Sequence, residues 1–453
     1  MKLRERSGWP VAIGALCCVG MANAYAAEST TEGGTAPTSE TTQTALHAQS
    51  TLIYQGNLPF HAPYRGENSL KSKGESKDTW TVTPAAGVRL WAGSELYFNP
   101  ELFQGFGLAG THGAAGFYNG EAQKGGSSIP EASVARIFLR QVWGFGGEQE
   151  MVKDDFNQLG GPRDVSRVTL TVGKISVSDL FDDNSYAHDP STSFFNWSIW
   201  EAGAFDYAAD QKGYTWGAAL ELNQKNWALR SGYFLVPVFS NAQPLDTDLG
   251  KRGQFVTELE TRTSFLSLPG KLRLLGWVSR ANAGNYTQAL ALNAAGADIN
   301  DAIVATRRTR TMYGFVAGAE QAMNDDLGVF ARASWGDGTN EIMSFTDIDR
   351  SLTVGISLKG TAWGRPNDTF ALAGAINGLS TSHRNWIAAG GLGVAIGDGQ
   401  LRYREEAILE TYYMIALRDP FALTMDYQFM ANPAYNADRG PVSVFSARLH
   451  GQF

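Results

Sequence analysis

Cysteine is almost missing from this chain of 453 residues, whose only two cysteines, Cys17 and Cys18, are adjacent near the N-terminus. No disulfide and no cysteine-ligated metal centre can therefore form within residues 27–453. Charged residues are also few, at 18%, and their balance is negative, with a formal net charge of −8. Because the phosphate backbone repels a negative surface, this composition argues against a nucleic-acid partner.

Long apolar runs are equally scarce. After residue 26 no continuous apolar stretch reaches the roughly 18 residues of a membrane-spanning helix. Residues 1–26 combine basic residues over 2–6, an apolar run over 9–21 and the sequence Ala24-Tyr25-Ala26, which are the three parts of a secretory signal. We predict a signal peptide cleaved after Ala26. The alternative, a membrane anchor, is disfavoured because the run has only about 13 residues.

Catalytic and cofactor motifs are lacking as well. The six histidines are scattered without the i, i+4 pairing of metal ligands, and no G-x-S-x-G motif occurs. Residues 105–110 match G-x-G-x-x-G, but no buried parallel strand precedes them, so turn glycines explain the match. We predict no enzyme, no catalytic or metal site and no cofactor.

What the chain does contain is glycine, aromatic residues and alternation with a period of two. Residues 27–48 are rich in Ser, Thr, Glu and Gly and predict a disordered leader. Beyond them, apolar residues such as Trp80 and Val82 alternate with polar ones such as Thr79 and Thr81. Such alternation places the two sets on opposite faces of a strand.

The alternation and its turn residues predict sixteen strands, over 50–58, 78–92, 94–101, 132–145, 164–174, 213–223, 227–237, 253–266, 271–280, 310–322, 327–336, 350–360, 369–378, 402–416, 421–430 and 441–453. Short and long connections alternate between them, as in outer-membrane barrels with an even strand count, short periplasmic turns and longer external loops. We therefore predict an all-β fold over residues 49–453: a transmembrane antiparallel up-and-down β-barrel of 16 strands. Connection 146–163 is too long for its side and has no explanation in this scheme.

A large secreted soluble β-protein would also alternate, but two features favour the membrane. Many strands begin or end with Trp or Tyr, as an interfacial girdle requires. The last strand ends on Phe453, which resembles the signal by which such barrels are recognised for assembly. We expect outer-membrane lipid and the barrel-assembly machinery as partners, and a homotrimer is one assembly compatible with this fold.

The polar faces of the predicted strands would line the lumen of such a barrel. The expected pore-lining residues are Arg89, Glu95, Glu101, Arg136, Arg140, Glu258, Glu260, Arg262, Glu320, Arg332 and Glu410. One interpretation is that they brace the wall as ion pairs, for example Glu320 with Arg332. The other is that their mixed donors and acceptors bind the hydroxyl groups of an uncharged solute.

Loop 175–212 is the expected constriction of the channel. It carries several acids and many aromatic residues, including Asp179, Asp182, Asp183, Trp197 and Trp200. The aromatic rings would be buried from water only if the loop folded into the lumen. Calcium binding by the acids is a weaker alternative, because no EF-hand spacing is present.

From about residue 50 to the end, the chain resembles the carbohydrate-selective porin family of OprB type. The matching stretches are 60–66 with 68–70, 89–91 with 99–101, 173–174 leading to 179–184, 196–197, 206–210 and 432–441. The resemblance implies a 16-stranded porin through which glucose and related sugars diffuse, past a constriction lined by Arg, Glu and aromatic residues. The predicted function is thus passive, sugar-selective diffusion of mono- and small oligosaccharides, with a general or anion-selective porin as the alternative.

Overall fold

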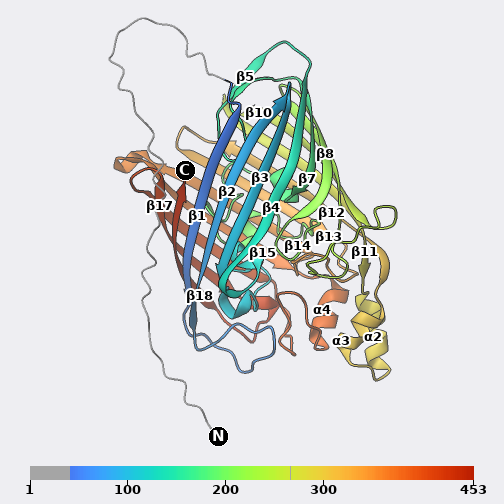
Figure 1. Ribbon diagram of the computed structural model, residues 1–453. Helices are drawn as coiled ribbons and strands as arrows, with labels where there is room; N and C mark the ends of the chain where they lie inside the picture. The colour runs from blue at the N-terminus through green and yellow to red at the C-terminus, as the bar shows by residue number, and fades with distance from the viewer. Residues whose placement is uncertain (1–40, 266) are drawn as a thin grey trace, which may run out of the picture. The chain divides into compact units, whose positions relative to one another are not determined.

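The structure, a computed structural model, describes residues 41–265 and 267–453. Sixteen antiparallel strands form a closed barrel in which β1 pairs with both β2 and β18 (Figure 1). The closing register sets Leu52 opposite Leu449 and Tyr54 opposite Ala447. The predicted fold class is confirmed. The predicted signal peptide and most of the predicted leader lie outside the described residues.

The strands are long and the helices short. The strands are β1 Thr44–Asn57, β2 Glu75–Trp91, β3 Ser94–Gly105, β4 Ser127–Gly144, β5 Gln149–Val152, β6 Gly161–Asp164, β7 Arg167–Ile175, β8 Thr215–Asn223, β9 Trp227–Phe234, β10 Gly253–Phe265, β11 Leu268–Ala283, β12 Arg308–Ala322, β13 Leu327–Gly336, β14 Arg350–Gly360, β15 Arg365–Gly378, β16 Glu406–Ala416, β17 Phe421–Ala431 and β18 Val442–Gln452. The α-helices are α1 Trp197–Trp200, α2 Tyr286–Ala294, α3 Ile299–Ala305 and α4 Thr381–Ala388, and the 3-10 helices are η1 Leu108–Gly110, η2 Gly120–Lys124, η3 Val177–Asp179, η4 Thr361–Trp363 and η5 Pro433–Tyr435.

Two segments differ from the predicted pattern. Strand β1 begins at Thr44, so part of the expected leader belongs to the sheet. The unexplained connection 146–163 contains β5, and β6 follows at Gly161–Asp164, so that the two make a separate two-stranded sheet. Period-two patterning does not detect β5 and β6 because each is only four residues long.

The outer surface of the barrel is apolar and carries aromatic residues near both ends. On β1, Leu52 and Tyr54 are exposed, whereas Thr51 and Gln55 are buried. The aromatic residues exposed at the end with the short turns include Trp91, Trp143, Trp227, Trp363 and Phe453. Those exposed at the end with the long loops include Trp216, Tyr233, Phe255 and Trp335. Two belts of this kind mark the membrane interfaces of outer-membrane barrels.

The lumen is largely filled by the long loops. Within it, the Trp197 ring lies 5.4 Å from Phe117, 5.1 Å from Trp200 and 5.0 Å from Phe345, measured between ring centroids. These rings come from three separate connections, so one aromatic core joins loops that are distant in sequence. Helices α2, α3 and α4 lie at one end of the barrel and β5 at the other (Figure 1). None of the helices in residues 41–265 and 267–453 has the length and apolar character to cross a membrane.

Candidate functional site in the barrel lumen

Loop 175–212 crosses the lumen from β7 to the strands on the opposite side. It begins with a capping box, in which the side chains of Ser176 and Asp179 each accept a hydrogen bond from the other residue's backbone N–H. Further along, Trp197 is fully buried and Trp200 nearly so, as their many ring contacts require. The loop therefore has a defined path inside the barrel.

Carboxylates of the far wall hold the loop backbone. Three of the predicted lumen acids accept N–H groups from it, over distances of 2.6 to 2.9 Å. The bonds run from Asp182 N to Glu258, from Ser185 N to Glu320 and from Phe195 N to Glu410. At Asp182 and Phe195 the bond satisfies a backbone donor that would otherwise be buried without a partner, at a cost of about 1 to 3 kcal/mol.

Arg332 of β13 is a second anchor for the loop. Its guanidinium donates to Asp182 Oδ1 at 3.1 Å and to the carbonyls of Ile199 and Ala187 at 2.9 and 2.8 Å. The predicted pair between Glu320 and Arg332 is wrong. The register places Arg332 opposite Gly318, and the loop acid Asp182 occupies the guanidinium instead.

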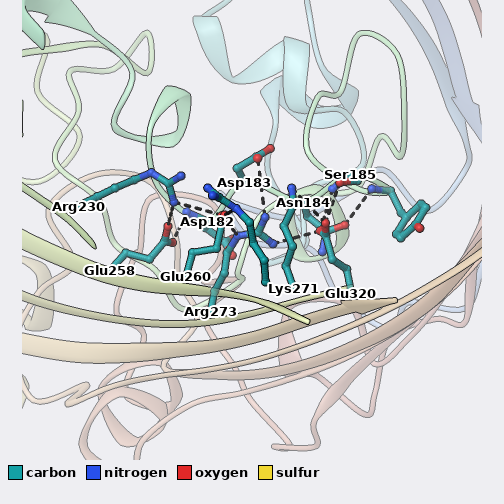
Figure 2. Close-up of polar contacts among 12 residues, drawn as sticks. Asp182, Asp183, Asn184, Ser185, Arg230, Glu258, Glu260, Lys271, Arg273 and Glu320 are labelled. Atoms are coloured by element: carbon teal, nitrogen blue, oxygen red, sulfur yellow. Dashed lines mark hydrogen bonds and ion pairs between the residues drawn. The ribbon is translucent and has the colours of Figure 1, made fainter. Parts of the chain in front are cut away.

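Beside these anchors, the strands β9 to β12 carry a row of alternating charges (Figure 2). Arg230 donates to Glu258 at 2.9 Å, and Arg273 lies between Glu260 at 3.2 Å and Glu320 at 3.1 Å. Arg262 extends the row by donating to Glu260 at 3.0 Å. Because every charge in this row has an opposite neighbour, the row stiffens the wall and leaves little net field.

A cavity of about 660 Å³ lies between the loop and the wall formed by β4, β7 and β8. Five predicted site residues line it, namely Glu101, Arg136, Arg140, Asp179 and Trp200. Glu258, Glu260, Arg262, Glu320, Arg332 and Glu410 are not among its lining residues. The structure thus divides the predicted lumen residues between two opposite walls.

Charges at the cavity are mostly paired. Arg136 binds Asp179 through both carboxylate oxygens, at 2.6 and 2.7 Å. Lys124 contacts Glu101 at 2.8 Å and Glu121 at 3.1 Å. Burial of Lys124 opposes its charge, but Glu101 and Glu121 outweigh burial and raise its pKa well above the ordinary value. The lining is therefore polar and close to neutral.

Several polar atoms of the cavity lining have no hydrogen-bond partner among the described residues. They include the acceptor Gln123 Oε1, the donor Trp200 Nε1 and the ring atom His188 Nδ1. Buried polar groups are usually paired, so unpaired donors and acceptors at a cavity mark places where a solute can bind. His188 lies in loop 175–212, the predicted constriction, whereas no motif indicated Gln123, which lies outside the patterned strands.

At the short-turn end, Glu95 is surrounded by guanidinium groups. Arg89 lies 3.2 Å away, Arg163 3.3 Å and Arg140 3.8 Å. The Tyr97 hydroxyl also donates to Glu95, at 2.7 Å. Sequence patterning pointed to Arg89, Glu95 and Arg140 but not to Arg163, which lies on β6. The only signal for Arg163 was its place at the end of an unusually long connection.

The loop acids bind arginines of the wall. Asp179 pairs with Arg136 and Asp182 with Arg332, and Asp183 lies 3.8 Å from Arg273. Within residues 41–265 and 267–453, no group of three or more His, Cys, Asp or Glu residues is arranged to hold a metal ion.

Asp206 joins loop 175–212 to the loop before β14. Its carboxylate accepts the backbone N–H groups of Met343 at 2.7 Å and Ser344 at 2.9 Å. Burial raises the pKa of Asp206 to about 6, against the lowering effect of these bonds, and Asp347 and Asp349 nearby add to the rise. A titratable group therefore holds two lumen-filling loops together.

A closed antiparallel barrel with an apolar outside, two aromatic belts and a polar cavity inside is a channel of the outer-membrane porin class, not an enzyme. The model of the family described as "Carbohydrate-selective porin, OprB family" matches residues 68–453, and this chain belongs to that family. No curated protein matches the chain by sequence.

Several solved structures are similar to this chain. The structure of Pseudomonas putida OprB at high pH is 14% identical, with a TM-score of 0.67 over 91% of this chain and 94% of that one. The same protein at low pH is 13% identical, with a TM-score of 0.49 over 91% and 93%. The outer-membrane channel DcaP of Acinetobacter baumannii is 9% identical, with a TM-score of 0.48 over 90% and 97%. At these identities the likeness to the high-pH OprB structure supports the fold alone.

Proposed function

We propose that this porin passes mono- and small oligosaccharides by passive, sugar-selective diffusion through the cavity between loop 175–212 and the wall of β4, β7 and β8. The observation that carries the proposal is the lining: paired charges together with unpaired donors and acceptors such as Trp200 Nε1 and Gln123 Oε1. Such a lining offers hydrogen bonds to hydroxyl groups without selecting an ion. Membership of a family described as carbohydrate-selective points in the same direction.

Aromatic and guanidinium groups at the cavity suit a sugar ring. Tyr214 lines the cavity with the Arg136 guanidinium 5.2 Å from its ring centre. Phe138 lines it too, with the Arg140 guanidinium 5.4 Å from its ring centre. Both rings are buried, so they hold the two guanidinium groups in place, and the guanidinium groups donate to the hydroxyls of the sugar. Each contact is weak, so a solute leaves as readily as it enters, and conduction requires this.

An anion-selective or general diffusion porin is the second candidate, and the surroundings of Glu95 favour it. Three arginines, Arg89, Arg140 and Arg163, face this single carboxylate. The local excess of positive charge could attract phosphate or another small anion. The rest of the cavity lining argues for the neutral solute, since its cations have their own acids.

The proposal is tested by conductance of the purified protein in planar bilayers. We expect the ion current to fall when neutral mono- or disaccharides are added, and liposomes containing the protein to swell in the same sugars. A current that ignores every sugar but is blocked by inorganic phosphate would replace the sugar proposal with the anionic one.

We also propose that residues 1–26 direct export, that the strand ending in Phe453 is recognised by the barrel-assembly machinery and that the short turns face the periplasm. The exposed Phe453 ring at the end of the last strand supports the second point. A homotrimer stays a prediction, which the mass of the detergent-solubilised protein would test.

A further inference from the structure

The connection between β4 and β7 builds a hairpin at the short-turn end of the barrel. Strands β5 and β6 pair from Gln149 with Asp164 to Val152 with Gly161. Beyond them, the backbones of Asp155 and Gln158 exchange two hydrogen bonds of 2.9 Å and close a tight tip. Asn157 in that tip adopts a left-handed conformation with φ of 58°. Asparagine tolerates this conformation better than most residues.

The hairpin is fixed to the inner wall rather than projecting freely from the barrel. Leu159 is fully buried, and its backbone N–H donates to the Tyr97 hydroxyl at 3.0 Å. Arg140 of β4 donates to the Asn157 carbonyl at 3.0 Å, and Gln452 of β18 donates to Asp155 at 2.9 Å. Contacts from β3, β4 and β18 hold the tip in one place. Ordinary turns between barrel strands need no such ties.

The tip forms one boundary of the 660 Å³ cavity. Residues 155–158 and Arg163 line it, together with Arg136 and Asp179 farther from the short-turn end. The same cavity is therefore bounded by loop 175–212 and by the hairpin. A solute that has passed the loop meets the tip next.

The chemistry of the tip matches that of the loop. The Asn157 side-chain oxygen is buried at the cavity wall without a hydrogen-bond partner among the described residues, and the half-buried Phe156 lines the cavity beside it. We infer that the β5–β6 hairpin is a second sugar-contacting element of this channel, in which Phe156 covers the C–H face of the sugar and Asn157 bonds a hydroxyl. The inference rests on the proposed sugar function and adds a specificity-determining segment to it.

Two substitutions separate this role from simple bracing of the wall. Asn157→Gly suits the left-handed backbone and keeps the carbonyl that Arg140 binds, so it removes only the amide group. Phe156→Ala removes only the ring. Phe145→Ala is the matched control, since Phe145 is an exposed phenylalanine at the base of the same connection and does not line the cavity.

The measurement is the sugar-induced block of single-channel current in planar bilayers, with sugar added to one side at a time. We expect each tip variant to weaken the block roughly two- to tenfold, as loss of one hydrogen bond or ring contact predicts. The loss should be larger for sugar added from the short-turn side, and Phe145→Ala should match the parent protein. The inference would be overturned if both tip variants showed the same sugar block as the parent protein, with sugar added from either side. A parent channel that shows no sugar block would instead contradict the proposed function.

Discussion

The two opposite walls of this barrel carry the same residue types but use them differently. On the strands from β10 round to β18, several inward Arg and Glu side chains bind loop 175–212, as when Glu410 binds the loop backbone and Arg332 binds Asp182. On β4, β7 and β8, inward side chains such as Arg136 and Arg140 face the open cavity. An inward charge therefore lines the cavity only where the docked loop leaves part of the side chain uncovered, as at Arg136, which binds Asp179 of the loop and still lines the cavity.

The difference between the walls follows from burial. A backbone N–H or a charge that is shut away from water needs a partner, and the loop and the far wall supply partners to each other. On β4, β7 and β8 the charged side chains face the cavity, where water can solvate them, so they need less complete pairing with opposite charges. Anchor residues should consequently control stability and pore width, whereas cavity residues should control which solute passes.

The largest effect should come from an anchor. Arg332→Ala removes the buried charge partner of the Asp182 carboxylate and the donor to three loop carbonyls, those of Asp182, Ala187 and Ile199. Loss of one partner of a buried ion pair costs about 3 to 5 kcal/mol. We expect a lower urea midpoint in detergent micelles and a larger, noisier single-channel conductance as the loop loosens. Arg418→Ala, in an exposed short turn, is the control and should change neither quantity. Parent-like stability and conductance in Arg332→Ala would mean that the far wall does not anchor the loop.

A smaller effect is expected from pH, through the joint between the two lumen-filling loops. The folded pKa of Asp206, about 6, lies above its usual value of about 3.9, so the folded state holds the proton more tightly. Tighter proton binding stabilises the folded state by about 2 to 3 kcal/mol. This stabilisation is fully present below about pH 4 and is lost as the pH rises through about 6. Asp206→Asn should flatten this part of the stability profile measured by urea unfolding.

The control for this profile is Asp248→Asn, because Asp248 is half exposed and pairs with Lys251 on the surface. Its stability profile should keep the slope of the parent protein. Identical slopes in Asp206→Asn and Asp248→Asn would show that the loop joint does not titrate in this range.

The smallest change in free energy should come from the cavity wall. Replacing Arg136 and Arg140 together with Ala removes two donors from the lining and leaves the far wall intact. We expect sugar block to weaken roughly tenfold, which corresponds to about 1.4 kcal/mol, with a wider conductance. The urea midpoint should fall less than in Arg332→Ala. Unchanged sugar block would assign both arginines to wall bracing alone.

The barrel could be predicted from the sequence because a strand repeats every two residues. Alternation such as that of Thr79 and Trp80 fixes which side chains point inward, and the structure buries the first and exposes the second. The same pattern cannot tell which inward residues meet a loop. Glu410 and its partner Phe195 are more than 200 positions apart in the chain, and no local rule connects them.

The hairpin at 149–164 shows the same limit. Its strands are too short to show a period-two alternation. Its position is set by contacts with residues distant in sequence, such as Tyr97 and Gln452. The sequence did indicate that something was unusual, since the connection was too long for its side of the barrel. What it could not indicate was that the extra residues reach the cavity.

Accessibility of engineered cysteines tests the difference between the walls most directly, since the chain after Cys18 contains no other cysteine. Thr169 lines the cavity, whereas Thr353 on the opposite wall is buried and donates to the Ser198 carbonyl of the loop at 2.6 Å. In the protein without residues 1–26, Thr169→Cys should react quickly with a charged, water-soluble thiol reagent and lose conductance, while Thr353→Cys should react far more slowly. Equal rates of modification and equal loss of current at both positions would contradict the account.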